Sequence, residues 1–283
     1  FGEFDNLWAR KCSDWAFDFV NIMQSTVDRI FACIEKNDPG HGIRIRADVP
    51  IATLITGNMM VSRFFVYQGE LTGRGIVFES GAGSNLNEVH ATRMQCNRFG
   101  GGGTAQAATM TNGSANIVVV DGSAYPVGMP VIFTSTANGF TQDRTYSVLT
   151  CAGNTITVGN TRNGAAVVAT GAAAIQIRSN GFPNVEVVGG LGSLVQHSQI
   201  LHIDAEGFST AQVYLENVGN CFFNVTELNV ANSLNSIVAR SVAYSGIESR
   251  KEAVIDFDGN SFTTEFSGSI HAMRQLRMYG ISY

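Results

Sequence analysis

Short runs in which apolar and polar residues alternate recur along most of the chain. Alternation with a period of two directs one set of side chains into a core and the other set away from it, as in a β-strand. The clearest runs are residues 15–19, 27–31, 41–45, 61–65, 74–78, 89–94, 200–206, 213–218, 222–230, 237–244 and 253–258. The pattern therefore predicts an all-β protein built from many short strands.

These runs also form a loose repeat. Residues 27–31 (Val-Asp-Arg-Ile-Phe) lead, after a polar stretch, to residues 41–45, and residues 61–65 (Val-Ser-Arg-Phe-Phe) lead in the same way to residues 74–78. Matching runs lie about 20 to 34 residues apart. A parallel β-helix tolerates this unequal spacing, because its strands stack at about 4.8 Å per rung while the turns vary in length. An immunoglobulin-like sandwich requires turn signals about every 8–12 residues, and the chain does not keep that spacing. We therefore predict a right-handed parallel β-helix.

The amino-acid composition changes between Gly100 and Arg178. After Gly103 the only charged residues before Arg178 are Asp121, Asp143, Arg144 and Arg162, and Ala, Thr, Gly and Val dominate. Turn dipeptides such as Asn-Gly at 138–139 separate the short apolar runs of this region, as in antiparallel hairpins. We predict β-helix rungs over residues 1–100, an inserted antiparallel β module over 101–178, and further rungs over 179–283.

Charge narrows the range of partners. The chain of 283 residues carries a formal net charge of −5, with three lysines beside fifteen arginines and 14% charged side chains. An ordinary soluble domain has roughly 25%. Because each phosphate contact needs a Lys or Arg, we expect no nucleic-acid partner. No stretch approaches the roughly 18 apolar residues of a membrane helix, so we expect no membrane insertion.

The cysteines and histidines do not have the spacing of residues that bind a metal ion. Five widely spaced cysteines with apolar neighbours indicate buried free thiols rather than disulfides. The five histidines lack a metal-ligand pattern such as HExxH. The glycines at 100–103 lack both the spacing and the following helix of a nucleotide-binding loop. We expect neither a metal nor a cofactor.

The most informative polar constellation is Leu-His-Ile-Asp-Ala-Glu at residues 201–206. If Leu201 and the next two alternate residues point into the core, then His202, Asp204 and Glu206 project together from one outer face. The same alternation places Tyr214 and Glu216 outside, next to inward apolar residues.

Stacked rungs would place such carboxylates several ångströms apart. Glycoside hydrolysis uses two carboxyl groups about 5 Å apart for retention of configuration and about 6.5–9.5 Å apart for inversion. Should the chain be an enzyme, one carboxyl acts as the acid or base and another as the nucleophile or water activator. The candidate catalytic residues are Asp204, Glu206, Glu216 and Glu227, and the candidate substrate-binding residues are His202, Tyr214 and Arg240. The alternative is that these acids are solvated surface groups, some of them paired with Arg240 or Arg250 on a neighbouring rung.

The chain resembles a bacteriophage tailspike or tail fibre of the pectate-lyase-like β-helix class. The resemblance covers about three quarters of the chain and rests on the loose rungs at 27–45 and 61–78, on the low Lys and high Gly and Asn content, and on the inserted Ala/Thr/Gly-rich module. Within that module the run Pro-Val-Gly-Met-Pro-Val at 126–131, Gly139-Phe140, Tyr146 and Asn-Thr-Ile-Thr-Val at 154–158 resemble modules inserted in tail fibres.

The resemblance implies a homotrimer that projects from a virion, is assembled in the host cytoplasm, and attaches to a bacterial surface polysaccharide such as lipopolysaccharide or capsule. The sequence starts at Phe1 in the middle of the pattern, so we expect an N-terminal part, missing here, to join it to other tail proteins. Whether the protein also cleaves the glycan stays open. The alternative function is that of a secreted microbial polysaccharide lyase or glycoside hydrolase of the same fold.

Overall fold

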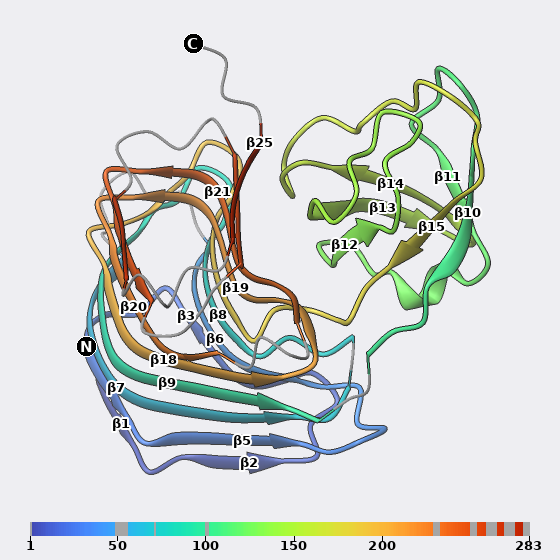
Figure 1. Ribbon diagram of the computed structural model, residues 1–283. Helices are drawn as coiled ribbons and strands as arrows, with labels where there is room; N and C mark the ends of the chain where they lie inside the picture. Colours follow the sequence, from blue (N-terminus) through green and yellow to red (C-terminus); the bar gives the residue numbers. More distant parts are fainter. Residues whose placement is uncertain are drawn as a thin grey trace.

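The protein consists of a parallel β-coil and a small antiparallel β-barrel (Figure 1). The structure is a computed structural model, and it describes residues 2–48, 56–70, 72–99, 102–228, 233–249, 254–258, 265–268 and 275–279. Within these ranges the only helical element is a single 3-10 turn, η1 (Gly122–Ala124). The prediction of an all-β protein is confirmed.

Within the described residues nineteen strands form the coil, and the chain passes alternately through two sides that we call stack A and stack B. Stack A contains β3 (Trp15–Val20), β6 (His41–Ala47), β8 (Ile76–Ser80), β16 (Val185–Gly189), β19 (Ser209–Gly219), β21 (Ser233–Ala243), β23 (Val254–Asp258) and β25 (Gln275–Tyr279). Stack B contains β1 (Gly2–Asp5), β2 (Trp8–Arg10), β4 (Met23–Asp28), β5 (Ile30–Ile34), β7 (Thr56–Gln68), β9 (Leu86–Arg98), β17 (Val195–Gln196), β18 (Gln199–Gly207), β20 (Phe222–Leu228), β22 (Gly246–Ser249) and β24 (Glu265–Gly268).

Neighbouring strands of the coil pair in parallel, and their register follows the repeat seen in the sequence. Val27 pairs with Val61 in stack B, and Ile43 pairs with Ile76 in stack A. Phe17 of β3 pairs in turn with Ile43. Parallel pairing excludes the antiparallel sheets of an immunoglobulin-like sandwich.

The side chains that alternate inward form one continuous core. Valine, isoleucine, phenylalanine and methionine side chains from both stacks pack inside the coil and are almost completely buried. Fully buried members such as Val61, Phe78, Val187 and Phe223 come from strands far apart in the sequence. Each buried side chain of this size stabilises the fold by about 1.5–3 kcal/mol relative to an exposed one. The core therefore supplies the main force that holds successive turns together.

Stack B bends at a corner, and this bend alters which side chains of β18 point into the core. Asn6, Arg29 and His202 have left-handed backbone conformations there, with φ of 55°, 49° and 49°. The bend at His202 brings Ile200 into the core, while Leu201 is only half-buried. The expectation that Leu201 points into the core is therefore wrong, because strict alternation does not continue through a left-handed residue.

The barrel closes in the order β10 (Gln106–Met110), β11 (Ile117–Val119), β14 (Thr155–Gly159), β13 (Tyr146–Ala152), β12 (Pro130–Phe133) and β15 (Ile175–Arg178). All of its strand pairings are antiparallel, and its side chains form a second core separate from that of the coil. The rungs of the coil before and after the barrel stack directly on each other, since β8 pairs with β16 and β9 pairs with β17 and β18.

All five cysteines are free thiols. Cys96 and Cys221 are buried as expected, whereas Cys12, Cys33 and Cys151 are only half-buried. In the part of the chain that the structure describes, no helix is long and apolar enough to cross a membrane.

Candidate functional site

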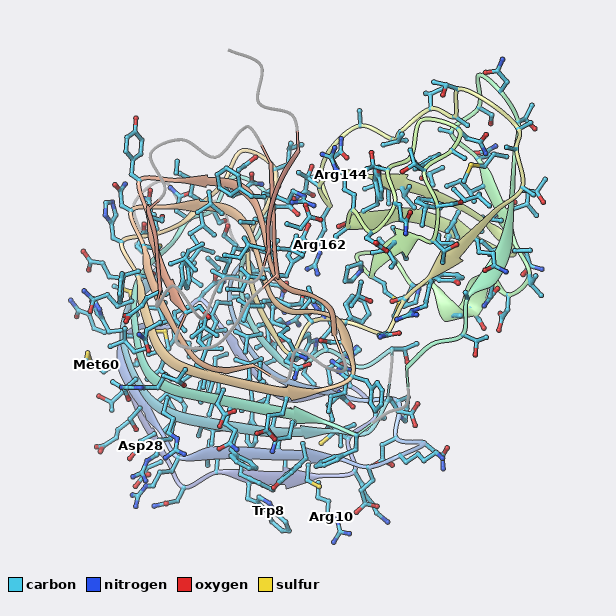
Figure 2. All side chains as sticks on the ribbon, in the orientation of Figure 1. Trp8, Arg10, Asp28, Met60, Arg144 and Arg162 are labelled. Atoms are coloured by element: carbon cyan, nitrogen blue, oxygen red, sulfur yellow. The ribbon has the colours of Figure 1, made fainter. Side chains whose placement is uncertain are left out.

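The barrel covers the outer surface of part of stack A. Side chains that alternate outward from β16, β19, β21 and β23 meet the barrel rather than water. The Ser147 hydroxyl lies 3.1 Å from the Tyr214 hydroxyl, and the Thr145 amide donates to Asp256 Oδ2 at 2.7 Å. Figure 2 shows Arg162 pointing into the junction between the two parts. Outward-facing positions of these four strands are thus interior positions of the molecule.

Two predicted site residues, Tyr214 and Glu216, lie in this junction and are fully buried. They point out of the coil as expected, but the expectation that they lie on an open outer face is wrong because the barrel covers them. The Tyr214 hydroxyl donates to Glu216 Oε2 at 2.6 Å, and the Arg162 amide donates to both carboxylate oxygens at 3.0 Å. Burial, followed by the charge of Glu216, raises the pKa of Tyr214 well above its ordinary value.

Arg240, a predicted substrate-binding residue, is also fully buried. It forms a 2.8 Å ion pair with Asp256, which is fully buried as well. It also donates to the carbonyl oxygens of Thr145 and Asn160 in the barrel, at 3.0 and 3.1 Å. Arg240 thus pairs with an acid on a neighbouring rung, as the alternative predicts, but that acid is Asp256 rather than one of the candidate catalytic residues, and the pair is buried instead of solvated. No polysaccharide reaches Tyr214, Glu216 or Arg240 in this conformation.

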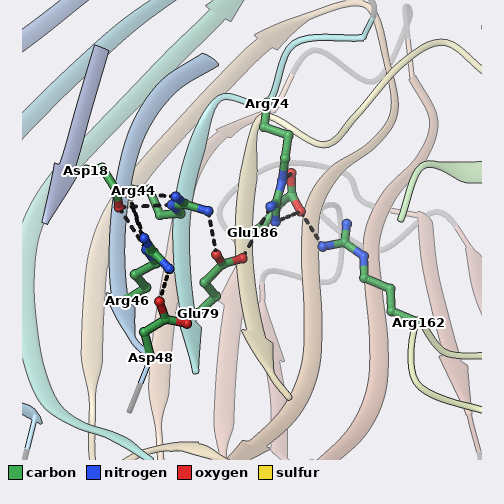
Figure 3. Close-up of polar contacts among 8 residues, drawn as sticks. All are labelled: Asp18, Arg44, Arg46, Asp48, Arg74, Glu79, Arg162 and Glu186. Carbon is green, nitrogen blue, oxygen red and sulfur yellow. Dashed lines mark hydrogen bonds and ion pairs between the residues drawn. The ribbon is translucent and has the colours of Figure 1, made fainter. Parts of the chain in front are cut away.

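A second set of charges extends this junction across the surface of stack A (Figure 3). Glu186 lies at its centre and pairs with Arg162 of the barrel at 2.6 Å and with Arg74 of the coil at 2.9 Å. Arg74 also pairs with Glu79 at 3.2 Å. The remaining members are Arg44, Arg46, Asp18 and Asp48, each of which pairs with at least one other member.

This junction network borders a hollow of about 390 Å³ between coil and barrel. Burial by itself raises the pKa of Glu186, but the opposing charges of Arg162 and Arg74 outweigh it and hold the pKa below its ordinary value. The pKa of Asp18 is lowered in the same way, against partial burial, by Arg44 and Arg46. A general acid at neutral pH needs a raised pKa, so neither Glu186 nor Asp18 is suited to donating protons. Glu186 instead holds the barrel on the coil through Arg162, and Asp18 joins β3 to β6 through Arg44 and Arg46.

The other predicted residues lie on stack B, away from the barrel. His202 is exposed on β18, and Asp204 and Glu206 are half-buried on the same strand. Glu227 lies on β20, and its backbone pairs with that of Asp204; its side chain is outside the described residues, as is Arg250. The structure thus separates Asp204 and Glu206 from Glu216 instead of joining all the predicted acids in one site.

Stack B carries a cluster of aromatic side chains on its outer surface, which we call the aromatic face. Its members are Trp8, Phe31, Phe65, Tyr67 and Phe99. Phe31 stacks on Phe65 with ring centroids 5.2 Å apart, and Tyr67 stacks on Phe99 at the same distance. Trp8 and Phe99 are about two-thirds exposed, and Figure 2 shows Trp8 pointing away from the coil.

The aromatic face adjoins a column of arginines at the corner of stack B. Arg63 pairs in register with Arg93, and Arg29 lies level with Arg63, since the flanking residues on each side are in register. Three successive rungs therefore present an arginine at one place. With Phe31, Phe65 and Gln95, these arginines line a surface hollow of about 360 Å³, which we call the corner groove.

The corner groove leads toward the predicted residues of β18. Gln95 pairs with Asp204, and His202 lies level with Arg93 because Ile200 and Ile203 pair with Ala91 and Met94. A chain-like ligand that runs along the coil axis through the groove would reach the outer face of β18 on the next rung.

Sequence analysis missed both charged sets, although signals for them exist. Arg29 and Arg63 occupy the same third position of the repeated runs at 27–31 and 61–65. Arg162 is one of only four charged residues between Gly103 and Arg178. Glu186 stands alone among valines in β16.

Within the described residues, no group of three or more His, Cys, Asp and Glu side chains is placed to hold a metal ion. No protein-family model matches the chain, and no curated protein matches its sequence. Among solved structures, the chain is similar to the Gp54 tailspike of Acinetobacter baumannii bacteriophage AP22 in complex with A. baumannii capsular saccharide. The identity is 13% and the TM-score is 0.20, over 81% of this chain and 40% of the tailspike chain. The chain thus spans well under half the length of that tailspike, and a TM-score this low has no bearing on function.

Proposed function

We propose that this chain is part of a phage tailspike or tail fibre that attaches to a bacterial surface polysaccharide, lipopolysaccharide or capsule. The observation that carries the proposal is the aromatic face beside the corner groove. Exposed rings offer flat apolar surfaces to the C–H faces of sugar rings, and a hydrogen-bonding rim fixes orientation. A polymer needs a shallow site that is open at both ends, and successive rungs of a coil provide one.

The architecture included in this proposal is a right-handed parallel β-helix over residues 1–100 and 179–283, with the module at 101–178 inserted between two rungs. Direct pairing of β9 with β18 supports the insertion. We further propose a homotrimer carried on the virion, joined to other tail proteins through a segment outside this sequence. Three tethered copies would turn the second and third sugar contacts into intramolecular ones and raise avidity.

Binding to purified bacterial polysaccharides tests the attachment. We expect Trp8→Ala and Phe99→Ala each to weaken binding about tenfold, as the loss of one aromatic contact of about 1.4 kcal/mol would do. Tyr244→Ala is the matched control, because Tyr244 is an equally exposed aromatic residue on the turn between β21 and β22. Equal effects of all three variants, or no binding to any polysaccharide, would contradict the proposal.

Cleavage of the bound polysaccharide is a second candidate activity, and it is favoured by the register that joins the corner groove to β18. Asp204 and Glu206 alternate on one strand, so their backbones are about 7 Å apart. An inverting pair needs carboxyl groups about 6.5–9.5 Å apart, and two side chains that leave one face at this spacing can reach such a separation. We expect Asp204→Asn and Glu206→Gln to abolish the release of reducing ends while binding persists; unchanged release would remove both residues from the site. Glu227→Gln tests the third acid on this side.

The alternative function, a secreted microbial polysaccharide lyase or glycoside hydrolase, predicts a monomer. Light scattering of the purified chain distinguishes the two functions. A mass of three times 30.3 kDa is expected for the phage protein. A monomer that degrades polysaccharide would favour the secreted enzyme.

A further inference from the structure

We infer that the polysaccharide bound by the corner groove is anionic, with carboxylate-bearing sugars placed against Arg63 and Arg93. This inference rests on the proposed attachment to polysaccharide and names the chemical class of its ligand. The groove is lined by three arginines and by no acidic residue. Such a surface favours negative charge, because a guanidinium binds a carboxylate more strongly than it binds the hydroxyl groups of a neutral glycan.

The three arginines of the column have too few acidic partners within the protein to neutralise their charge. Arg29 pairs with Asp5 at 2.6 Å and with Asp28 at 3.2 Å. Arg63 lies 3.9 Å from the same Asp28, at the limit of an ion pair. Among the residues that the structure describes, none forms an ion pair with Arg93. The net positive charge at each arginine therefore increases along the column, from Arg29 to Arg93.

Stacking brings these like charges close together. Register neighbours in a sheet lie about 4.8 Å apart, so the paired backbones of Arg63 and Arg93 carry two guanidinium groups on adjacent rungs. Both side chains are exposed and free to turn toward a ligand. A planar guanidinium binds a carboxylate through two parallel hydrogen bonds. Arg29 already forms such a pair with Asp5, so the bidentate sites open to a ligand are those of Arg63 and Arg93.

The rings beside the arginines complete the site. Phe31 and Phe65 line the same groove and are only half-buried. A sugar ring carrying a carboxylate can place its C–H face on the Phe65 ring while its carboxylate meets Arg63 on the same rung. Gln95 takes the place of an aromatic residue on the third rung and offers hydrogen bonds to hydroxyl groups.

Aromatic rings beside arginines also bind single-stranded nucleic acid, but the flanking acids favour a saccharide. Asp204 and Glu206 follow on the next rung of the same side. A nucleic acid carries a phosphate on every nucleotide and would meet these carboxylates at close range. A polysaccharide with one carboxylate per repeat unit can pass them with a neutral sugar.

The test uses the full chain with a panel of purified bacterial capsular polysaccharides, each in native form and in a carboxyl-reduced, neutral form. We expect the bound polysaccharides to be acidic and their carboxyl-reduced forms to bind at least tenfold more weakly. Arg63→Gln and Arg93→Gln are each expected to weaken binding of the acidic form about tenfold, as the loss of one charged hydrogen-bonded contact does. Lys36→Gln, which removes an exposed positive charge outside the groove, is the control and should leave binding unchanged.

The outcomes separate the inference from the proposed function. Equal binding of native and reduced forms, or binding of neutral polysaccharides alone, would overturn the inference and leave the attachment function standing. Absence of binding across the panel would overturn both. A single-stranded oligo-dT that binds more tightly than any polysaccharide, with the same loss in the two arginine variants, would assign the groove to nucleic acid instead.

Discussion

Arg162 of the barrel and Glu186 of the coil form an ion pair of 2.6 Å in which the Glu186 side chain is fully buried. Arg74 meets the same carboxylate from the coil, so one buried negative charge lies between two guanidinium groups. Arg162 also lies over the ring of Tyr214, 4.6 Å from its centroid. The junction between coil and barrel thus depends on charges that are costly to bury unless every partner is present.

The first prediction concerns this pair. Replacing Arg162 with Met removes one of the two positive charges that compensate the buried Glu186, and such losses cost about 3–5 kcal/mol. We expect a lower midpoint of thermal unfolding, measured by calorimetry. Lys11→Gln is the control, because the Lys11–Glu35 pair is exposed and 3.6 Å long, and surface pairs contribute about 0–1 kcal/mol. If the two variants were equally stable, the buried pair would not hold the barrel on the coil.

A second prediction follows from the pKa of Glu186, which is held below its ordinary value of 4.5. A carboxyl whose pKa is lower in the folded than in the unfolded chain stabilises the fold fully above the unfolded pKa, and this contribution is lost as the pH falls further. We expect the thermal midpoint to decline below about pH 4.5 and the Glu186→Gln variant to decline less steeply. Parallel declines in the two proteins would count against the assignment.

His41 is expected to cause a separate loss of stability on acidification, at a higher pH than that of Glu186. Burial, followed by the charge of Arg74, lowers its pKa below the ordinary 6.5. The unfolded chain therefore binds a proton more readily than the folded one, so stability falls as the pH drops below 6.5 and levels off below the folded pKa. His41→Gln keeps an acceptor for the Arg74 amide, which donates to His41 Nδ1 at 3.1 Å. We expect this variant to lose the step near pH 6 and to keep the step at lower pH; a profile that keeps both steps would refute the role of His41.

Much of the coil could be predicted from sequence because alternation and register are local properties. The match of Val27 with Val61 is visible in the repeat, and it is the register of the sheet. The outer surface is different, since alternation says which side chains leave the coil but not what covers them. Glu216 and Arg240 alternate outward as predicted, yet a module some tens of residues earlier in the chain buries both.

The arginines of the corner groove could have been predicted from the sequence repeat. Arg29 and Arg63 recur at one position of the repeat, and a residue that recurs in a repeat forms a column in the stacked structure. The neighbouring aromatics could equally have packed inside rungs or between subunits. Only the register shows that Phe31 and Phe65 lie on the same side as the arginines.

A further prediction concerns the thiols. Burial raises the pKa of Cys96 to about 12 and that of Cys221 to about 11. Because the thiolate is the reactive form, we expect neither to react with iodoacetamide at about pH 8 while the protein is folded, as measured by peptide mass spectrometry. All five cysteines should react after unfolding in guanidinium, which is the control. Rapid labelling of Cys96 in the folded protein would show that the coil interior is not packed around it.

The last prediction tests the tight contact between β9 and β18. Gly207 has a φ of 89°, and a Cβ added there would lie 1.8 Å from the carbonyl oxygen of Arg98. The Arg98 side chain is buried and donates from Nη1 to the carbonyl oxygens of Glu70 and Gly73 at 2.6 and 2.9 Å. A methyl group at Gly207 would displace this strand end and strain those bonds.

Gly192 provides the matched control, because it has a φ of 70° and open space where its Cβ would be. Gly192→Ala should cost only the left-handed backbone strain of about 1–2 kcal/mol. Gly207→Ala should cost the same strain and about 1–3 kcal/mol more for the displaced neighbour. Thermal unfolding of the two variants measures the difference. Equal midpoints would mean that the end of β18 can move away from Arg98, and the close packing of these two rungs would then not be needed for stability.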